Sequence, residues 1–362
     1  MIKVAINGFG RIGRLVHRVL LERFFDQAEV VGINAGSSTD IQGWMFLLKY
    51  DSVYGSLANH TLDVIVNSAK QSPIGTEIAS GFANPRNDIG CLVIDGVQIP
   101  VYSQKDPSLL PWKDLDVDVV IESTGVFRKK EDLEKHIQAG AKKVVLSAPE
   151  KGGDIPTYVL SVNQDTYSGE PIISNASCTT NCITPIAKII EENFGIEKAM
   201  MTTIHGYTSD QRLADGGHKD YRRARAAAQN IIPTSTGATY AAAAAFPQLE
   251  NKFAGLAIRV PVPVGSLSDF TFVLKKETTK EAVNEVLKKA AESEAYKGIV
   301  AVTEDPIVSS DVIGSSYSSI VDLSLTQVVG GNLVKVIAWY DNEFGYVNRL
   351  VEETIMVGSA SQ

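Results

Sequence analysis

The chain has 362 residues, 44% of them hydrophobic, and a formal net charge of −8. This length suffices for about two domains, and no apolar run approaches the roughly eighteen residues that a membrane span needs. The acidic balance argues against nucleic acid as a primary partner, and three cysteines in so long a chain predict a reducing, cytoplasmic location.

The first 150 residues or so alternate short β-rich runs with helix-like stretches. This alternation predicts an α/β domain with a parallel sheet. The predicted strands are 3–8, 28–34, 117–124 and 141–149, and the predicted helices are 13–25 and 129–140. Residues 68–98 are rich in Gly, Pro, Asn and Ser, and predict an extended loop with short strands.

From about residue 198 the β-rich runs become longer and are separated by loops. They cover residues 198–207, 255–263, 268–276 and 332–341, with one clear helical pattern at 279–296. This second pattern predicts a mixed or antiparallel sheet.

A glycine-rich motif, Gly8-Phe9-Gly10-Arg11-Ile12-Gly13, follows the first predicted strand and opens the first helix. Glycines at this spacing allow a tight turn and let a pyrophosphate approach backbone N–H groups at a helix N-terminus. A tight turn without a ligand remains an alternative. In its strand-turn-helix context the motif predicts a dinucleotide site.

The second strand of such a domain usually ends in an acidic residue that binds the adenosine ribose. Here Ala35 occupies that position. The missing carboxylate removes an acceptor for a ribose 2′-hydroxyl, and it also removes the repulsion that would exclude a 2′-phosphate. The sequence therefore leaves open whether the cofactor is NAD or NADP, and Asp40 or a backbone group could replace the ribose contact.

Cys178 precedes a stretch, 179–194, that has isoleucines on one side and predicts a helix. At a helix N-terminus a thiolate is stabilised, and we expect a depressed thiol pKa and N–H groups able to hold an oxyanion. A buried inert cysteine is the alternative, and it is our interpretation of Cys91 and Cys182. No metal site is predicted, because no histidine lies near Cys178 or Cys182 in the sequence.

A nucleophilic cysteine requires a base, and the chain has five histidines. His205 ends a predicted strand among polar residues and is the first candidate, with His218 as the second. His60 and His136 lie in polar surroundings that predict solvated surface positions. Downstream, arginines and hydroxyl residues between 222 and 259 suit a phosphorylated substrate, although a solvated basic face would account for some of them.

Six segments, taken together and in order, resemble phosphorylating glyceraldehyde-3-phosphate dehydrogenase over essentially the full length. They are "INGFGRIGR", "SNASCTTNC", "HGYTSDQR", "RRARAAAQNIIPTSTGA", "RVPVP" and "WYDNEFGYVNR". The resemblance implies a Rossmann NAD(P)-binding domain over residues 1–176 and an α+β catalytic domain over 177–341. It further implies a C-terminal helix at about 342–362 that packs back on the first domain, and a homotetramer.

The resemblance also implies the reaction: oxidation of glyceraldehyde 3-phosphate to 1,3-bisphosphoglycerate with inorganic phosphate and NAD or NADP. Cys178 resembles the nucleophile of the family and His205 its activating base. The residues matching substrate and phosphate contacts are Ser177, Thr179, Thr208, Arg223, Thr236, Gly237 and Arg259. Those matching cofactor contacts, besides Gly8, Gly10, Arg11, Ile12 and Gly13, are Ala35, Lys105, Thr124, Ser147 and Asn342.

Three features depart from the family pattern. Ala35 replaces an aspartate of the NAD-specific members, and Gly216-Gly217 replaces a Leu-Pro pair before His218. Both changes weaken the expectation that the cofactor is NAD alone. The third departure is the lengthened segment 68–98, to which no chemistry is assigned. The alternatives are an erythrose-4-phosphate dehydrogenase, a cysteine acyl hydrolase and a nucleotide-binding scaffold without turnover.

Overall fold

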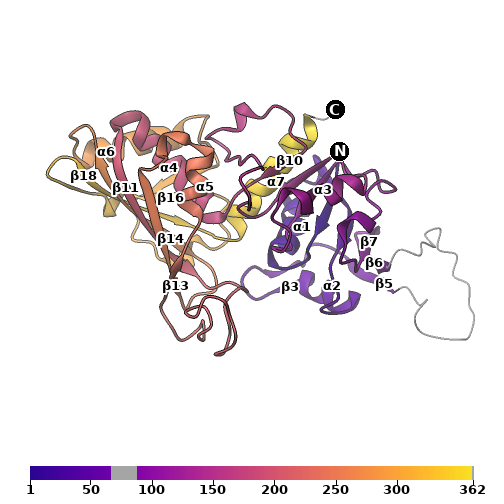
Figure 1. The fold of residues 1–362 in the computed structure, drawn as a ribbon. Helices are drawn as coiled ribbons and strands as arrows, with labels where there is room; N and C mark the ends of the chain where they lie inside the picture. Colours follow the sequence, from indigo (N-terminus) through magenta and orange to yellow (C-terminus); the bar gives the residue numbers. More distant parts are fainter. Residues whose placement is uncertain (67–87, 361–362) are drawn as a thin grey trace, which may run out of the picture. The chain divides into compact units, whose positions relative to one another are not determined.

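The computed structural model of the chain describes residues 1–66 and 88–360. The chain divides into two compact units, each with its own sheet (Figure 1). The first comprises Met1–Ile155, Gly169–Ser174 and Leu350–Gln362, and the second Pro156–Ser168 and Asn175–Arg349. Most of the predicted 68–98 loop, residues 67–87, lies outside the described residues.

The first unit is built on a sheet with the strand order β10-β9-β8-β1-β2-β7-β6-β5. Its strands are β1 (Ile2–Asn7), β2 (Ala28–Asn34), β5 (Leu62–Val66), β6 (Asp88–Ile94), β7 (Val97–Tyr102), β8 (Val119–Glu122), β9 (Lys143–Leu146) and β10 (Ile172–Ser174). Its helices are α1 (Arg11–Arg23), α2 (Ile41–Lys49) and α3 (Lys130–Gln138), and β3 (Tyr50–Asp51) pairs with β4 (Gly55–Ser56).

Strands β7, β2, β1, β8, β9 and β10 pair in parallel, as the alternating pattern predicts. The chain moves outward from β1 in one direction and then, from β8, in the other, which is the doubly wound order of a dinucleotide-binding domain. Ligands of such sheets bind beyond the carboxyl ends of the strands where the order reverses. That point lies between β1 and β8.

The far edge of this sheet is antiparallel, which the sequence analysis did not predict. Strand β6 pairs antiparallel with both β5 and β7. Only Asp95 and Gly96 separate β6 from β7, and both have positive φ, at 49° and 83°. A two-residue Asp-Gly turn of this kind twists as neighbouring strands do and closes a hairpin.

The second unit contains a mixed sheet with the order β12-β13-β11-β14-β18-β16-β15, and β17 pairs with β18. Its strands are β11 (Ile196–Gly206), β12 (Ile232–Ser235), β13 (Phe253–Val260), β14 (Ser266–Leu274), β15 (Val300–Thr303), β16 (Ser319–Asp322), β17 (Gln327–Val329) and β18 (Leu333–Tyr340). Most pairs are antiparallel, but β11 with β13 and β15 with β16 are parallel. Helices α4 (Cys178–Phe194), α5 (Ala238–Ala245) and α6 (Lys280–Glu292) pack against this sheet.

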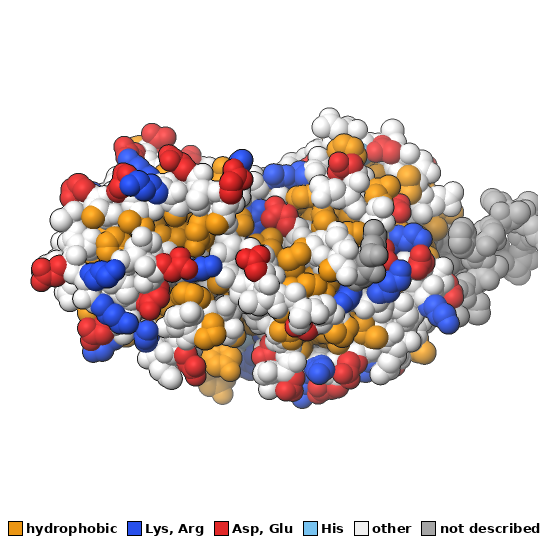
Figure 2. Space-filling view, turned by 90° about the horizontal axis from the view of Figure 1, so that it is seen from above, with side chains coloured by type: hydrophobic (Ala, Val, Ile, Leu, Met, Phe, Trp, Pro, Cys, Tyr) orange, Lys and Arg blue, Asp and Glu red, His pale blue; other side chains and the backbone are white. Residues whose placement is uncertain are grey.

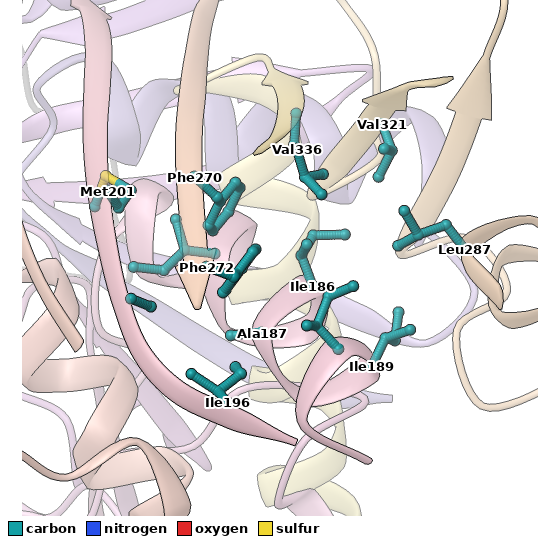
Figure 3. Packing of buried hydrophobic residues seen from close by; sticks show 14 of the residues in the cluster. Ile186, Ala187, Ile189, Ile196, Met201, Phe270, Phe272, Leu287, Val321 and Val336 are labelled. Carbon is teal, nitrogen blue, oxygen red and sulfur yellow. The ribbon is translucent and has the colours of Figure 1, made fainter. Parts of the chain in front are cut away.

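The core of the second unit forms where α4 packs on the sheet (Figure 3). Ile186 and Ile189 of α4 point toward a group that includes Phe270 and Phe272 of β14, and all four are buried. Burying one isoleucine side chain stabilises the fold by about 1.5–3 kcal/mol. Several such residues along α4 hold the helix firmly, and with it the position of its first turn.

The last helix, α7 (Phe344–Ser359), is shared between the two units. Its residues up to Arg349 belong to the second unit, and those from Leu350 onward belong to the first. Near the end of α7, Gly358 lies against Ile2 of β1, where a Cβ would come within 2.7 Å of the Ile2 side chain. The C-terminal helix therefore completes the first unit beside its first strand.

Candidate active site

The sequence around Cys178 fixes this residue at the first position of α4. Ser177 is the N-cap, and its hydroxyl accepts a hydrogen bond from Thr180 N at 3.1 Å. Ala176, just before it, has a left-handed backbone with φ 55°, and its carbonyl accepts a hydrogen bond from Tyr346. Because the first turn of a helix has N–H groups without intrahelical partners, the Cys178 thiol lies beside a set of backbone donors.

Strand pairing brings His205 and Arg259 together. They are directly paired residues of the parallel strands β11 and β13. His205 Nε2 lies 3.4 Å from Cys178 Sγ, and Arg259 Nη1 lies 2.7 Å from His205 Nδ1. The Gly206 carbonyl is 2.6 Å from the same Nδ1 and 3.1 Å from Arg259 Nη1. A guanidinium can only donate, so the Arg259 contact requires Nδ1 to accept, whereas the Gly206 contact requires Nδ1 to donate. In the second tautomer, with the proton on Nδ1 and Arg259 donating to the Gly206 carbonyl, the Nε2 lone pair faces the thiol.

Burial keeps both members of the pair neutral. It raises the pKa of the Cys178 thiol, against the lowering effects of Arg259 and of hydrogen bonds at Thr179. It also lowers the pKa of His205 to about 3, and the Arg259 charge acts in the same direction. The expected depression of the thiol pKa is therefore wrong for this state, because loss of solvent outweighs the nearby cation.

Tyr340, which the sequence analysis did not single out, supports the Cys178–His205 pair. Its ring meets the His205 ring edge-on, with 6.0 Å between centroids. Its hydroxyl lies 3.0 Å from Thr179 Oγ1 and 2.8 Å from Thr203 Oγ1. Tyr340 is buried, so these contacts restrict both His205 and the residue next to the nucleophile.

Asn342 joins the same cluster through Ser266, another residue not anticipated from the sequence. Ser266 Oγ accepts a hydrogen bond from Gly206 N at 3.1 Å and donates to Asn342 Oδ1 at 2.7 Å. The amide oxygen of Asn342 is therefore engaged, which fixes the orientation of its amide. A continuous chain of contacts runs from Cys178 through His205 and Gly206 to Asn342.

The residues expected to bind phosphate are only partly assembled around the thiol. Thr236 and Gly237 precede α5, and the first turns of α4 and α5 meet where Thr180 Oγ1 donates to the Ala238 carbonyl at 3.5 Å. Arg223 instead donates to Asp210 of the loop after β11 at 2.6 Å, and to Thr234 at 3.0 Å and the Ser235 carbonyl at 3.1 Å on β12. Thr208 lies near the start of that loop, where its backbone N donates to Gln211. No hydrogen bond between described residues joins it to Cys178.

In the first unit a cavity of about 450 Å³ lies beyond the carboxyl ends of the strands, where the strand order reverses. Among the predicted cofactor residues, Gly8, Gly10, Ala35, Lys105 and Thr124 line it. Arg11, Ile12, Gly13 and Ser147 do not, and Arg11 forms a two-pronged ion pair with Asp51 at 3.1 and 3.3 Å.

The three glycines of the motif serve different purposes. A Cβ on Gly8 would lie 2.6 Å from Thr124 N, and one on Gly13 would lie 2.1 Å from the Gly8 carbonyl oxygen. Both positions must therefore be glycine for the turn to close. At Gly10, the N-cap of α1, a Cβ would meet nothing within 4 Å. The open space at this helix N-terminus fits an anionic group such as a pyrophosphate.

The structure corrects two interpretations of single residues. His136 is fully buried instead of solvated, because α3 directs it inward against Trp112 and Glu122. Cys91, on β6, is partly exposed, since this strand belongs to the antiparallel edge of the sheet. Cys182 is buried as expected, and burial raises its pKa to about 12.

Over residues 1–66 and 88–360, no group of three or more His, Cys, Asp and Glu side chains could hold a metal ion. None of the helices described combines the length and the apolar character needed to cross a membrane. On the face in Figure 2, acidic and basic side chains are interspersed and form no broad field of one sign.

Comparison with known proteins identifies both parts of the chain. Residues 2–72 and 82–130 match the family model described as the NAD binding domain of glyceraldehyde 3-phosphate dehydrogenase, and residues 177–342 match the model of its C-terminal domain.

Full-length relatives agree with these two models. The glyceraldehyde-3-phosphate dehydrogenase of Streptomyces coelicolor is 50% identical over 99% of both chains. That of Thermotoga maritima is 52% identical over 97% of this chain and 98% of its own. A chloroplastic one of Arabidopsis thaliana is 49% identical over 97% of this chain and 82% of its own. The chain belongs to the glyceraldehyde-3-phosphate dehydrogenase family.

Proposed function

We propose that Cys178 is the nucleophile and His205 the base with which this family member converts D-glyceraldehyde 3-phosphate to 1,3-bisphosphoglycerate. The observation that carries the proposal is the 3.4 Å contact between Cys178 Sγ and His205 Nε2 at the first turn of α4. A partly buried thiol beside a buried neutral imidazole is suited to a proton transfer that accompanies attack on a carbonyl. The named relatives do not favour the erythrose-4-phosphate alternative.

In the first step Cys178 Sγ bonds to the aldehyde carbon, and the thiol proton passes through His205 to the carbonyl oxygen, giving a hemithioacetal. The backbone N–H groups of the first turn of α4 would stabilise the developing oxyanion. When bound, NAD or NADP would supply the oxidant for this step. His205 takes the hydroxyl proton as the hemithioacetal becomes a thioester, a role worth roughly 10² to 10⁴ in rate.

In the last step inorganic hydrogen phosphate attacks the thioester carbon, the C–S bond breaks, and Cys178 leaves as a thiolate. The thiolate takes back the proton that His205 holds, and the proton of the hydrogen phosphate is the one released over the whole cycle. We assign the substrate's own phosphate to Thr208 and Arg259, and the attacking phosphate to Ser177, Thr179, Thr236, Gly237 and Arg223. Arg259 is supported by its contact with His205, whereas Arg223 would have to exchange its bond to Asp210 for one to phosphate.

The first-unit cavity is the proposed dinucleotide site. The turn formed by Gly8, Gly10 and Gly13 would receive the pyrophosphate, and Ala35 and Lys105 would lie toward the adenosine ribose. We keep Arg11, Ile12, Thr124 and Ser147 as further contacts. Asn342 would hold the nicotinamide carboxamide through its amide nitrogen, because its oxygen already accepts from Ser266.

We propose a homotetramer in the cytoplasm, with a nucleotide-binding domain over 1–176 and a catalytic domain over 177–341. Large exposed apolar side chains of the second unit support an assembly, because contact with another copy would remove them from water. Five of these side chains are between 70% and 86% exposed: Met200, Ile231, Tyr240, Leu213 and Tyr221. Light scattering coupled to size exclusion should give four times the chain mass, and a single-chain mass would contradict this.

The test of the mechanism is Cys178→Ser. This variant should lose acyl-phosphate formation by at least a thousandfold while binding NAD⁺ as the unmodified protein does, because the cavity of the first unit is untouched. Cys91→Ser, at a partly exposed cysteine of the first unit, is the matched control and should keep full activity. If Cys178→Ser still formed acyl phosphate, the assignment of the nucleophile would be wrong.

A phosphate series separates this reaction from acyl hydrolysis. Turnover with glyceraldehyde 3-phosphate should depend on inorganic phosphate and yield acyl phosphate in equal amount to reduced nicotinamide. Release of free acid at the same rate without phosphate would instead indicate a cysteine acyl hydrolase.

A further inference from the structure

A buried hydrogen-bonded chain crosses the first unit directly beneath the cavity. It begins at Trp112, whose indole Nε1 lies 2.9 Å from His136 Nδ1. An indole N–H can only donate, so His136 Nδ1 must accept and the imidazole proton must sit on Nε2. From there His136 donates to Glu122 Oε2 at 3.2 Å. The tautomer of His136 is therefore fixed by its two neighbours.

Glu122 collects donors on both carboxylate oxygens. Asn7 Nδ2 donates to Oε2 at 2.5 Å, in addition to His136. Thr124 donates to Oε1 with its backbone N at 2.8 Å and also with its hydroxyl. Glu122 is fully buried, and four donors replace the water that its carboxylate gives up.

The chain continues through two asparagines whose amides are held in one orientation each. Because Asn7 Nδ2 donates to Glu122, its Oδ1 is free to accept from Asn34 Nδ2, at 2.7 Å. Asn34 Oδ1 in turn accepts from Gln104 N at 2.9 Å, and Asn34 Nδ2 also reaches the Gln104 carbonyl at 2.9 Å. The donors therefore point toward Glu122 from both sides, from Trp112 through His136 and from Asn34 through Asn7.

This chain joins the carboxyl ends of β1, β2 and β8 with the segment that follows β7. Four of its members, Asn7, Asn34, Gln104 and Thr124, also line the cavity, next to Ala35 and Lys105. Trp112, His136 and Glu122 do not line it and are wholly buried. The far members can therefore affect a ligand only through the lining residues that they hold.

We propose that this hydrogen-bonded chain fixes the cavity in its binding shape, so that Glu122 and His136 are positioning residues for the dinucleotide. The proposal rests on the cofactor function proposed for the cavity. Weakening the chain at its buried end should loosen Thr124 and the two asparagines, and so reduce cofactor affinity. The chemistry at Cys178, whose supporting contacts lie in the second unit, should be unaffected once cofactor is bound.

The experiment compares His136→Leu, which removes both nitrogens, with His136→Gln, which keeps a donor toward Glu122, and with Trp112→Phe, which removes only the indole donor. The Kd of NAD⁺ is measured by titration, and KM and kcat by steady-state turnover. We expect His136→Leu to raise Kd and KM about tenfold or more, on the order expected for losing a hydrogen bond to a charged group. We expect His136→Gln to raise Kd and KM less than His136→Leu does. For both His136 variants, kcat at saturating cofactor should stay within about twofold of the unmodified protein.

Leu133→Ala is the matched control, because Leu133 lies on the same helix, packs in the same core as Trp112 and belongs to no bond of the chain. It should lower Tm as His136→Leu does while leaving Kd nearly unchanged. If His136→Leu raised Kd no more than Leu133→Ala, the role would be structural and the proposal overturned.

Equal Kd values for His136→Leu and His136→Gln would also overturn it. Direct titration of Kd needs no turnover. A failure of the proposed reaction would therefore leave the unmodified protein binding NAD⁺ without product, an outcome distinct from failure of this proposal.

Discussion

Introducing an acid at the end of β2, as Ala35→Asp, tests how the cavity chooses between NAD and NADP. The residues lining the cavity include Lys105 and no Asp or Glu. The neighbouring Asn34 side chain is turned inward and held by Asn7 and Gln104. Ala35 is therefore the strand-end residue from which a carboxylate could reach the ribose.

The size of the effect follows from charge and hydrogen bonding. A 2′-phosphate carries about −1.5 to −2 charges, and a carboxylate about 5 Å away repels each unit of charge by roughly 1 to 3 kcal/mol at effective dielectric constants between about 80 and 20. A charged hydrogen bond to the 2′-hydroxyl of NAD adds about 1.5 kcal/mol in the opposite sense. Together these should shift the ratio of kcat/KM for NAD⁺ over NADP⁺ by at least about a hundredfold toward NAD⁺.

The assay follows absorbance of the reduced nicotinamide with glyceraldehyde 3-phosphate and inorganic phosphate at saturation. Ala35→Asn is the control, because it adds a similar side chain without charge and should move the ratio by less than about tenfold. A ratio for Ala35→Asp within threefold of the unmodified protein would refute the reasoning, since it would mean that residue 35 does not face the ribose.

Two further predictions concern buried groups. Ser266→Ala should free the amide of Asn342, and so lower kcat/KM for the dinucleotide about tenfold and weaken the stereospecificity of hydride transfer, measured with deuterated cofactor. Ser266→Thr keeps the hydroxyl and should retain both the kcat/KM and the stereospecificity. Full stereospecificity in Ser266→Ala would contradict this prediction. His17 is buried, and burial with the nearby His60 lowers its pKa to about 3, so the unfolded chain binds one more proton between pH 6.5 and 3. The contribution of His17 to the free energy of unfolding is therefore complete above pH 6.5 and falls by up to about 1.4 kcal/mol per pH unit below it. His17→Phe should flatten the decline of Tm as the pH is lowered, and an unchanged slope would contradict the assignment.

Local signals predicted the parts of the fold that local sequence determines. The glycine motif lies between β1 and α1, and Cys178 lies at the first position of α4, because turn geometry and helix capping depend on neighbouring residues. The Asp95-Gly96 turn between β6 and β7 depends on an equally local signal.

Contacts between residues that lie far apart in the sequence could not be predicted from local patterns. His136 looked solvated because its sequence neighbours are polar, whereas its burial depends on Glu122 and Trp112, 14 and 24 residues away. Ser266 reaches Asn342 across 76 residues, and only strand pairing brings them together. The raised pKa of the Cys178 thiol likewise reflects burial by the whole unit, which a helix-end argument does not include.

The division of α7 between the two units has a consequence for synthesis on the ribosome. The first unit needs Leu350 and the residues after it, which are translated about 195 residues later than Ile155. At roughly 5 to 20 residues per second, its sheet waits about 10 to 40 seconds for the segment that covers it beside Ile2. The second unit is also completed late, because its own last segment ends at Arg349. We therefore expect the nascent chain to expose an incomplete nucleotide-binding half while the second unit is being synthesised, and this is the stage at which chaperones would be needed.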